Sequence, residues 1–231
     1  MTELLVEKPQ EQFENFLKSG KYRQRLSEMA IRGSTSIMVD FEDLLIADQS
    51  LAESIIEKFD EYLEYANNAA FDQLRIEDPE YAERIKDLGV TVRFRGLPFS
   101  TRMRSLGSDH IGKLVMLEGI IIRTTTVQPL VTNAVFKCRR CETKVPMPQT
   151  GMFLSVPLRC TNPQCGRTGF FDFLQEESEF IDSQRIRMQE YPEELPPGQT
   201  PRSLDVQLVG KDLVDVARPG DRVYVVGIVR G

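Results

Sequence analysis

The sequence contains no tryptophan, one histidine and only four cysteines among its 231 residues. With His110 as the single imidazole, a metal site built from several histidines is excluded, and any Ser-His-Asp or Cys-His catalysis would depend on that one residue. No apolar run approaches the roughly 18 residues that span a bilayer. The N-terminus is acidic, unlike a secretory signal. These absences exclude many hydrolase classes and predict a cytoplasmic or nuclear protein without membrane association.

The formal net charge of −6 is distributed unevenly along the chain. The first ninety residues hold 10 Lys and Arg against 20 Asp and Glu, whereas the remainder holds 19 against 15. Of those 19 basic residues 15 are arginine, whose planar fork suits phosphates and base edges. An arginine-rich proteome would explain the same count. The basic second part therefore keeps nucleic acid among the candidate partners despite the acidic total.

The acidic first part has the patterns of short helices. Apolar residues recur at helical spacing over 11–30, where Gly20 predicts one interrupted helix or two short ones. Ser50 and Glu53 match a capping box at the start of another helix. A further short helix is expected within 78–89, opened by an Asp-Pro pair. We therefore predict a small acidic helical bundle.

After residue 89 the apolar period changes to two, which indicates strands. Gly112 and Gly220 each precede a mid-strand glycine, Gly119 or Gly227, by seven residues, and such interior glycines predict a bulge or sharp bend. The segment 191–201 contains four prolines and is expected to be a loop. The pattern favours a five-stranded Greek-key barrel of the OB type, with strands at 90–95, 114–127, 180–189, 203–209 and 222–230.

The four cysteines are spaced as two close pairs. They read Cys138-x2-Cys141-x18-Cys160-x4-Cys165, a spacing typical of two turns that bring four thiolates to the corners of a tetrahedron around a structural Zn²⁺. Two disulfides or a rubredoxin-type iron site are the alternatives, and a reducing compartment disfavours the first of them. The apolar contacts of this unit are expected from Phe136, Phe153, Phe170 and Phe171.

No catalytic motif is found in the sequence. Residues 107–113 match G-x4-G-K, but the hydroxyl residue that binds Mg²⁺ is missing and a predicted strand follows where a phosphate-binding loop needs a helix. His110 within this segment is interpreted as a turn residue. These 231 residues are therefore not expected to form an enzyme by themselves.

The order of these features resembles the N-terminal region of the minichromosome maintenance (MCM) replicative DNA helicases. The specific likeness lies in Leu117–Arg123, the four cysteines, Arg185–Glu190, 196–202 and 212–222. The resemblance implies an α+β multidomain fold. Its parts would be a helical bundle at 1–89, an OB-fold β-barrel formed by 90–130 and 176–231, and an inserted four-cysteine zinc-ribbon subdomain at 131–175.

The resemblance also implies a function: the DNA-binding and hexamerisation collar of a replicative helicase. Family arginines that bind single-stranded DNA match Arg123, Arg187 and Arg202, and Arg185 is an alternative because it lies two residues from Arg187 on the same strand face. Surface ion pairs are the competing interpretation of each. The implied partners are single-stranded DNA, double-stranded DNA as a second form, further copies in a hexamer or double hexamer joined through the zinc subdomain, and other replication factors.

The sequence ends before any Walker motif, so the resemblance places ATP and Mg²⁺ only in a C-terminal AAA+ motor outside it. The expected location is the archaeal cytoplasm, at the nucleoid, or the nucleus for a eukaryotic member. The loop at 191–201 matches the family loop that passes signals to the motor, or it is a rigid connector. A different class stays open: a zinc-ribbon and OB assembly scaffold that does not contact DNA.

Overall fold

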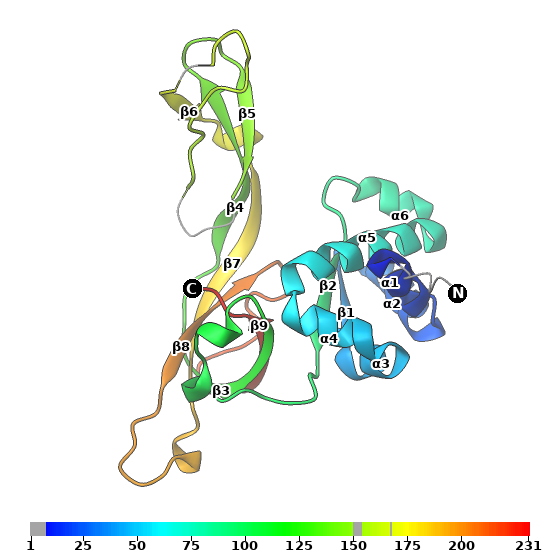
Figure 1. The fold of residues 1–231 in the computed structure, drawn as a ribbon, viewed down its shortest axis with the longest axis vertical. Helices are drawn as coiled ribbons and strands as arrows, with labels where there is room; N and C mark the ends of the chain where they lie inside the picture. The colour runs from blue at the N-terminus through cyan, green and yellow to red at the C-terminus, as the bar shows by residue number, and fades with distance from the viewer. Residues whose placement is uncertain (1–7, 150–153, 167) are drawn as a thin grey trace, which may run out of the picture. The chain divides into compact units, whose positions relative to one another are not determined.

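The computed structural model describes residues 8–149, 154–166 and 168–231, which form a set of helices followed by an antiparallel sheet (Figure 1). They divide into two compact units. The first consists of the described residues up to Ile120 with Gln189–Ser203 and Arg222–Gly231, and the second consists of Ile121–Met188 and Leu204–Asp221. Within the described ranges no helix combines the length and the apolar character needed to cross a membrane.

The helical part of the first unit contains six α-helices and two short strands in the described residues. They are α1 (Pro9–Leu17), α2 (Gly20–Arg32), β1 (Ser36–Asp40), α3 (Phe41–Ala47), α4 (Gln49–Glu57), α5 (Phe59–Glu77), α6 (Pro79–Arg84) and β2 (Thr91–Arg95). The predicted break near Gly20 is confirmed, since α2 begins at that residue. One large core holds these elements together, and it includes Leu114 and the half-buried Met116, Val226 and Ile228 from the strands of the same unit.

Two of the helices in this part of the chain are capped by aspartate side chains. The side chain of Asp48 accepts a hydrogen bond from the backbone N–H of Leu51 and caps α4, and Asp78 caps α6 in the same way through Tyr81. The capping box predicted at Ser50 is therefore wrong: Ser50 is the second residue of α4 and lies two residues after the cap, Asp48.

Strand β2 does not belong to the barrel, which corrects the expectation for 90–95. It pairs with β1 in parallel, with Ser36 opposite Thr91 and Asp40 opposite Arg95, in a separate two-stranded sheet. Its inward face supplies buried Val92 and Phe94 to the helical core, where the Phe94 ring meets Phe41 edge-on at 6.3 Å between centroids. The period-two pattern identified a strand, but alternation does not specify which strand it pairs with.

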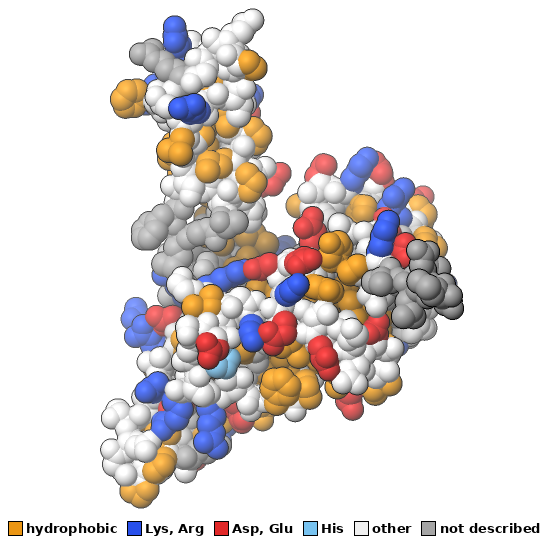
Figure 2. Space-filling view, in the orientation of Figure 1, with side chains coloured by type: hydrophobic (Ala, Val, Ile, Leu, Met, Phe, Trp, Pro, Cys, Tyr) orange, Lys and Arg blue, Asp and Glu red, His pale blue; other side chains and the backbone are white. Residues whose placement is uncertain are grey.

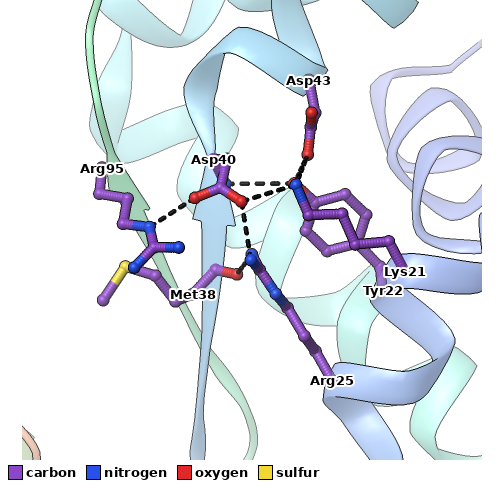
Figure 3. Close-up of polar contacts among 7 residues, drawn as sticks. All are labelled: Lys21, Tyr22, Arg25, Met38, Asp40, Asp43 and Arg95. Atoms are coloured by element: carbon purple, nitrogen blue, oxygen red, sulfur yellow. Dashed lines mark hydrogen bonds and ion pairs between the residues drawn. The ribbon is translucent and has the colours of Figure 1, made fainter.

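Asp40, at the end of β1, binds three cations (Figure 3). Its carboxylate lies 2.8 Å from Lys21 Nζ and 2.7 Å from Arg25 Nη2, and it also accepts a hydrogen bond from Arg95. The Tyr22 hydroxyl accepts a hydrogen bond from the backbone N–H of Asp40. Burial alone would raise the pKa of Asp40, but the bonds from Arg95, Lys21 and Arg25 outweigh it and hold that pKa well below its usual range.

Replacing Asp40 by alanine should lower the free energy of unfolding by about 1–3 kcal/mol at pH 7, because Arg25 and Arg95 lose their carboxylate and Lys21 keeps only Asp43 as a counter-charge. Since the folded pKa is depressed, this contribution is fully present above the unfolded value near 4, declines as pH falls below that value, and is lost as pH falls through the folded pKa. The exposed Glu83→Ala variant, which breaks only a surface pair with Lys86, should stay within about 0.5 kcal/mol. Chemical denaturation at pH 7 and pH 3 measures the free energy of unfolding of each variant. Equal stabilities for Asp40→Ala and the unmodified chain at pH 7 would contradict this prediction.

The second part of the chain forms a seven-stranded sheet. Its strands are β3 (Leu114–Thr124), β4 (Gln128–Cys138), β5 (Lys144–Pro148), β6 (Phe171–Phe173), β7 (Glu179–Gln189), β8 (Ser203–Val209) and β9 (Arg222–Ile228). The main order is β5-β4-β7-β3-β9, while β6 pairs with β4 and β8 with β7. The predicted loop at 191–201 joins β7 to β8. In the second unit β4 and β7 form a long ribbon, and β5 and β6 lie at one end of it (Figure 1).

The two mid-strand glycines have different surroundings. They lie in the regular antiparallel pairing of β3 with β9, where Gly119 faces Val223 and Gly227 faces Val115, so of the two predicted features, a bulge or a sharp bend, neither glycine forms the bulge. A Cβ atom at Gly119 would lie 2.6 Å from the backbone oxygen of Gln189 and 2.6 Å from Met103 Cε, whereas one at Gly227 would meet nothing within 4 Å. The lack of a side chain at Gly119 thus allows the backbone of Gln189 to approach closely.

Gly119→Ala should destabilise the chain by about 1–3 kcal/mol, because a backbone oxygen cannot move aside as a flexible side chain can. Gly227→Ala is the matched control on the partner strand and should change stability by less than about 0.5 kcal/mol. Urea denaturation of both variants measures the difference. Equal effects would show that the close approach is not what selects glycine at 119.

Candidate metal centre and basic surface

The four cysteines converge at the end of β4. Cys138 is the last residue of that strand, Cys141 lies in the turn after it, and Cys160 and Cys165 come from a second turn. Their four sulfur atoms all lie within 4.8 Å of one another, and the Sγ atoms of Cys141 and Cys160 are 3.4 Å apart. All four are free thiols, so the disulfide alternative has no support.

Backbone hydrogen bonds shape both turns. In the first, the N–H of Glu142 donates to the carbonyl of Cys138 at 2.9 Å, and Glu142 takes a positive φ of 59°. In the second, the N–H groups of Cys165 and Gly166 both donate to the carbonyl of Asn162, at 3.0 and 2.9 Å. These bonds turn the chain so that each close pair presents its sulfurs to the same point.

The donor set fits a tetrahedral metal ion. Four thiolates about 2.3 Å from a Zn²⁺ have sulfur–sulfur edges of about 3.8 Å, which the observed spacing allows with small shifts. Hydrogen bonds to Thr143 lower the pKa of the Cys141 thiol to about 6. At Cys160 a hydrogen bond from the backbone of Asn162 lowers the pKa, but burial and the neighbouring Cys141 and Cys138 raise it more, to about 12. Four cysteines leave no coordination position for a substrate, which is typical of structural sites.

The aromatic contacts around the cysteines differ from the expected set. Phe136 is buried and its ring lies 5.7 Å from that of Phe173. Phe170 is 81% exposed. Within the described residues its one aromatic contact is with the Arg139 guanidinium, whose Cζ lies 6.0 Å from the ring centroid. Phe170 is therefore not a core residue, and Phe171 is half-buried. Phe153 lies outside the described residues.

Three of the four predicted arginines lie around one acidic residue. Arg187 on β7 donates from Nε and Nη2 to both oxygens of Asp205 on β8, at 2.6 and 2.7 Å. This bidentate pair lowers the pKa of Asp205, and the charges of Arg185 and Arg123 lower it further. Arg123, Arg185 and Arg187 are all exposed. Basic side chains are visible over β8 in the space-filling view (Figure 2).

Arg202 belongs to the other unit and has different neighbours. Its Nη1 donates to the backbone carbonyl of Arg104 at 3.2 Å, and its backbone N–H donates to Glu190 Oε2 at 3.0 Å. Glu190 in turn binds the Arg104 guanidinium at 2.7 Å, which holds the pKa of this carboxyl at about 2. Arg202 is thus fixed at the base of the 191–201 loop. There the backbone N–H of Glu190 donates a hydrogen bond to the backbone carbonyl of Arg202.

Asp205, Glu190 and Arg104 are residues that the sequence interpretation missed. Asp205 alternates with the less exposed Leu204 and Val206, so the sequence marked it as a solvent-facing strand residue. Its pairing with Arg187 depends on the alignment of two strands across a loop with four prolines, which the sequence does not specify.

Two family models match the chain: the MCM N-terminal domain over residues 10–96 and the MCM OB domain over residues 102–231. The chain belongs to the MCM family. The first match contains the helices, and the second contains the whole seven-stranded sheet with the four cysteines. The predicted membership is confirmed, as is the combination of helices with an antiparallel sheet of the MCM OB type.

Curated relatives come from archaea, plants and animals. Minichromosome maintenance protein MCM of Saccharolobus solfataricus is 35% identical over 214 residues, 90% of this chain and 30% of that protein. DNA replication licensing factor MCM6 of Arabidopsis thaliana is 33% identical over 94% of this chain and 27% of its own length. DNA replication licensing factor mcm4 of Xenopus tropicalis is 32% identical over 90% and 24%. The chain spans less than a third of the length of these MCM proteins.

Proposed function

We propose that this chain is the DNA-binding and hexamerisation collar of an MCM replicative helicase, and that it binds single-stranded DNA through OB-fold arginines. The observation that carries the proposal is the group of Arg123, Arg185 and Arg187, three exposed guanidinium groups around one carboxylate in an OB-family domain. OB folds bind single strands through basic grooves that follow the phosphates. Arg202, held by Arg104 and Glu190, is a fourth candidate in the other unit.

A salt titration tests this proposal against the scaffold alternative. A fluorescein-labelled oligothymidine should bind saturably at low salt, and log K should fall linearly with log salt because phosphate contacts release counterions. Little sequence preference is expected, since phosphate contacts do not depend on the base. A scaffold that does not contact DNA would give no saturable binding at any salt concentration.

We also infer one structural Zn²⁺ per chain, held by Cys138, Cys141, Cys160 and Cys165. The convergence of four free thiols within 4.8 Å supports it. When bound, the metal joins two turns that have few apolar contacts of their own, which is how small zinc units are stabilised. Elemental analysis should return about one equivalent of zinc, whereas iron as the main metal would favour the rubredoxin-type alternative.

The zinc subdomain is proposed to join two hexamers. Its exposed apolar side chains support an interface at this end of the β4–β7 ribbon, where hydrophobic residues gather in Figure 2. They are Leu154, Val156, Leu158, Phe170 and Phe173. Light-scattering mass with and without single-stranded DNA should give six or twelve copies, and a persistent monomer would contradict the assembly.

The remaining assignments concern the whole protein. The domain bounds stay a prediction: 1–89, 90–130, 131–175 and 176–231. The strand at 91–95 is the exception, and its pairing with β1 assigns it to the helical part. The acidic helices are placed outside the DNA channel, since their charge would repel phosphates. ATP and Mg²⁺ would act in a motor outside these residues, which contain no Walker motif. Other replication factors would meet the assembled ring, in the archaeal cytoplasm or the eukaryotic nucleus.

A further inference from the structure

Asp205 occupies the hydrogen-bonding fork of Arg187. Both carboxylate oxygens accept hydrogen bonds, from Nε at 2.6 Å and from Nη2 at 2.7 Å. This is the bidentate geometry in which a guanidinium also binds a phosphate, so the carboxylate takes the position that a DNA phosphate would need. The two side chains are 47% and 59% exposed, and an incoming strand can therefore reach the pair from solvent.

The charge of Asp205 acts on more than one arginine. Arg185 and Arg123 both interact with it electrostatically, so the three cations share one anion. The lowered pKa of Asp205 keeps it ionised at neutral pH. A strand bound to this group would meet three positive charges and one negative charge, and it would either displace the carboxylate or lie beside it.

Exposed ion pairs hold their partners weakly, because water solvates both charges and salt screens them. The exchange of the Asp205 carboxylate for a phosphate is therefore easy in both directions. A resident carboxylate that returns as the phosphate leaves lowers the affinity and speeds release. Such behaviour suits a protein whose DNA has to move through it.

We propose that Asp205 is a competing anion that occupies the fork of Arg187 in the absence of DNA and limits how tightly a single strand is held. The proposal rests on the proposed DNA-binding function. If Asp205 instead positioned Arg187 for DNA, removal of its carboxylate would weaken binding. As a competing anion, its removal should strengthen binding.

Asp205→Asn tests the proposal on the full chain with labelled oligothymidine. Removing one negative charge about 5 Å from a phosphate should tighten binding on the order of three- to tenfold at low salt, mainly by slower dissociation. The gain should shrink at high salt. Asp182→Asn is the matched control, since Asp182 is also an exposed aspartate of the second unit and lies on the same strand as Arg187. It should change affinity less than about twofold.

An Arg187→Ala background tests whether the effect depends on the ion pair. In that background Asp205→Asn should raise log K for oligothymidine by less than half as much as in the unmodified chain, because the guanidinium fork that the change would free is absent. Weaker or unchanged binding by Asp205→Asn, or an equal gain from Asp182→Asn, would overturn the proposal while the arginine variants still test the proposed function. No binding by the unmodified chain would overturn both. The melting temperatures of the variants and of the unmodified chain should agree within about 2 °C, because the ion pair is exposed.

Discussion

The double variant Arg123→Ala, Arg187→Ala should bind single-stranded DNA more weakly by a few kcal/mol at low salt. Each arginine contact to a phosphate or base contributes on the order of 1 kcal/mol or more. Loss of two phosphate contacts should also flatten the salt slope by about 1.4, since each contact to a single strand contributes about 0.7. Fluorescence anisotropy over a series of salt concentrations measures both quantities.

A second double variant, Lys137→Ala with Lys144→Ala, controls for net charge. These lysines belong to the same unit and form ion pairs with Glu142 and Glu177, but they lie on β4 and β5 near the cysteines. Its affinity should fall by much less. If the arginines served only as salt bridges, the first variant would instead melt at a lower temperature and keep its affinity and salt slope.

Replacing Cys160 by serine should abolish zinc binding and unfold the insertion around the cysteines. Cys160 is buried within the sulfur cluster, and the free energy of zinc binding supplies most of the stability of such small units, about 10 kcal/mol or more in isolated zinc peptides. The core that joins the helices to β3 and β9 lies in the other unit and should remain folded. Association of hexamers should weaken as the insertion unfolds.

Metal analysis with limited proteolysis measures the outcome. New cleavage sites are expected within 131–175 and not within the helices. Thr161→Ala, an exposed change next to the same cysteine, should keep the zinc and the cleavage pattern of the unmodified chain. A Cys160→Ser chain that still holds one zinc equivalent would show that the four cysteines are not the ligand set.

Local patterns in the sequence predicted most elements of this fold. Apolar spacing located the helices on both sides of Gly20, and alternation located the strands that became β3, β7, β8 and β9. Cysteine spacing predicted that four thiols converge, because close pairs in tight turns leave few other arrangements. These features depend on residues near one another in the chain.

The failures depend on contacts between distant residues. The strand at 91–95 pairs with 36–40 and not with the barrel, a choice made by burial of Val92 and Phe94 in the helical core. Phe170 was expected to supply apolar contacts near the cysteines, but the ring that lies against buried Phe136 is that of the partly exposed Phe173. The pairing of Arg187 with Asp205 across β7 and β8 was also missed, although it determines which groups a DNA strand has to displace.

The most direct test of the central claim is a crystal structure of the chain with a bound oligothymidine. Phosphates or bases are expected within hydrogen-bonding distance of the Arg123 and Arg187 guanidinium groups, with the Asp205 carboxylate displaced from at least one of the two nitrogens that it now binds. A strand that lies along α1–α6, with the Arg187–Asp205 pair intact and no contact to either arginine, would contradict the account.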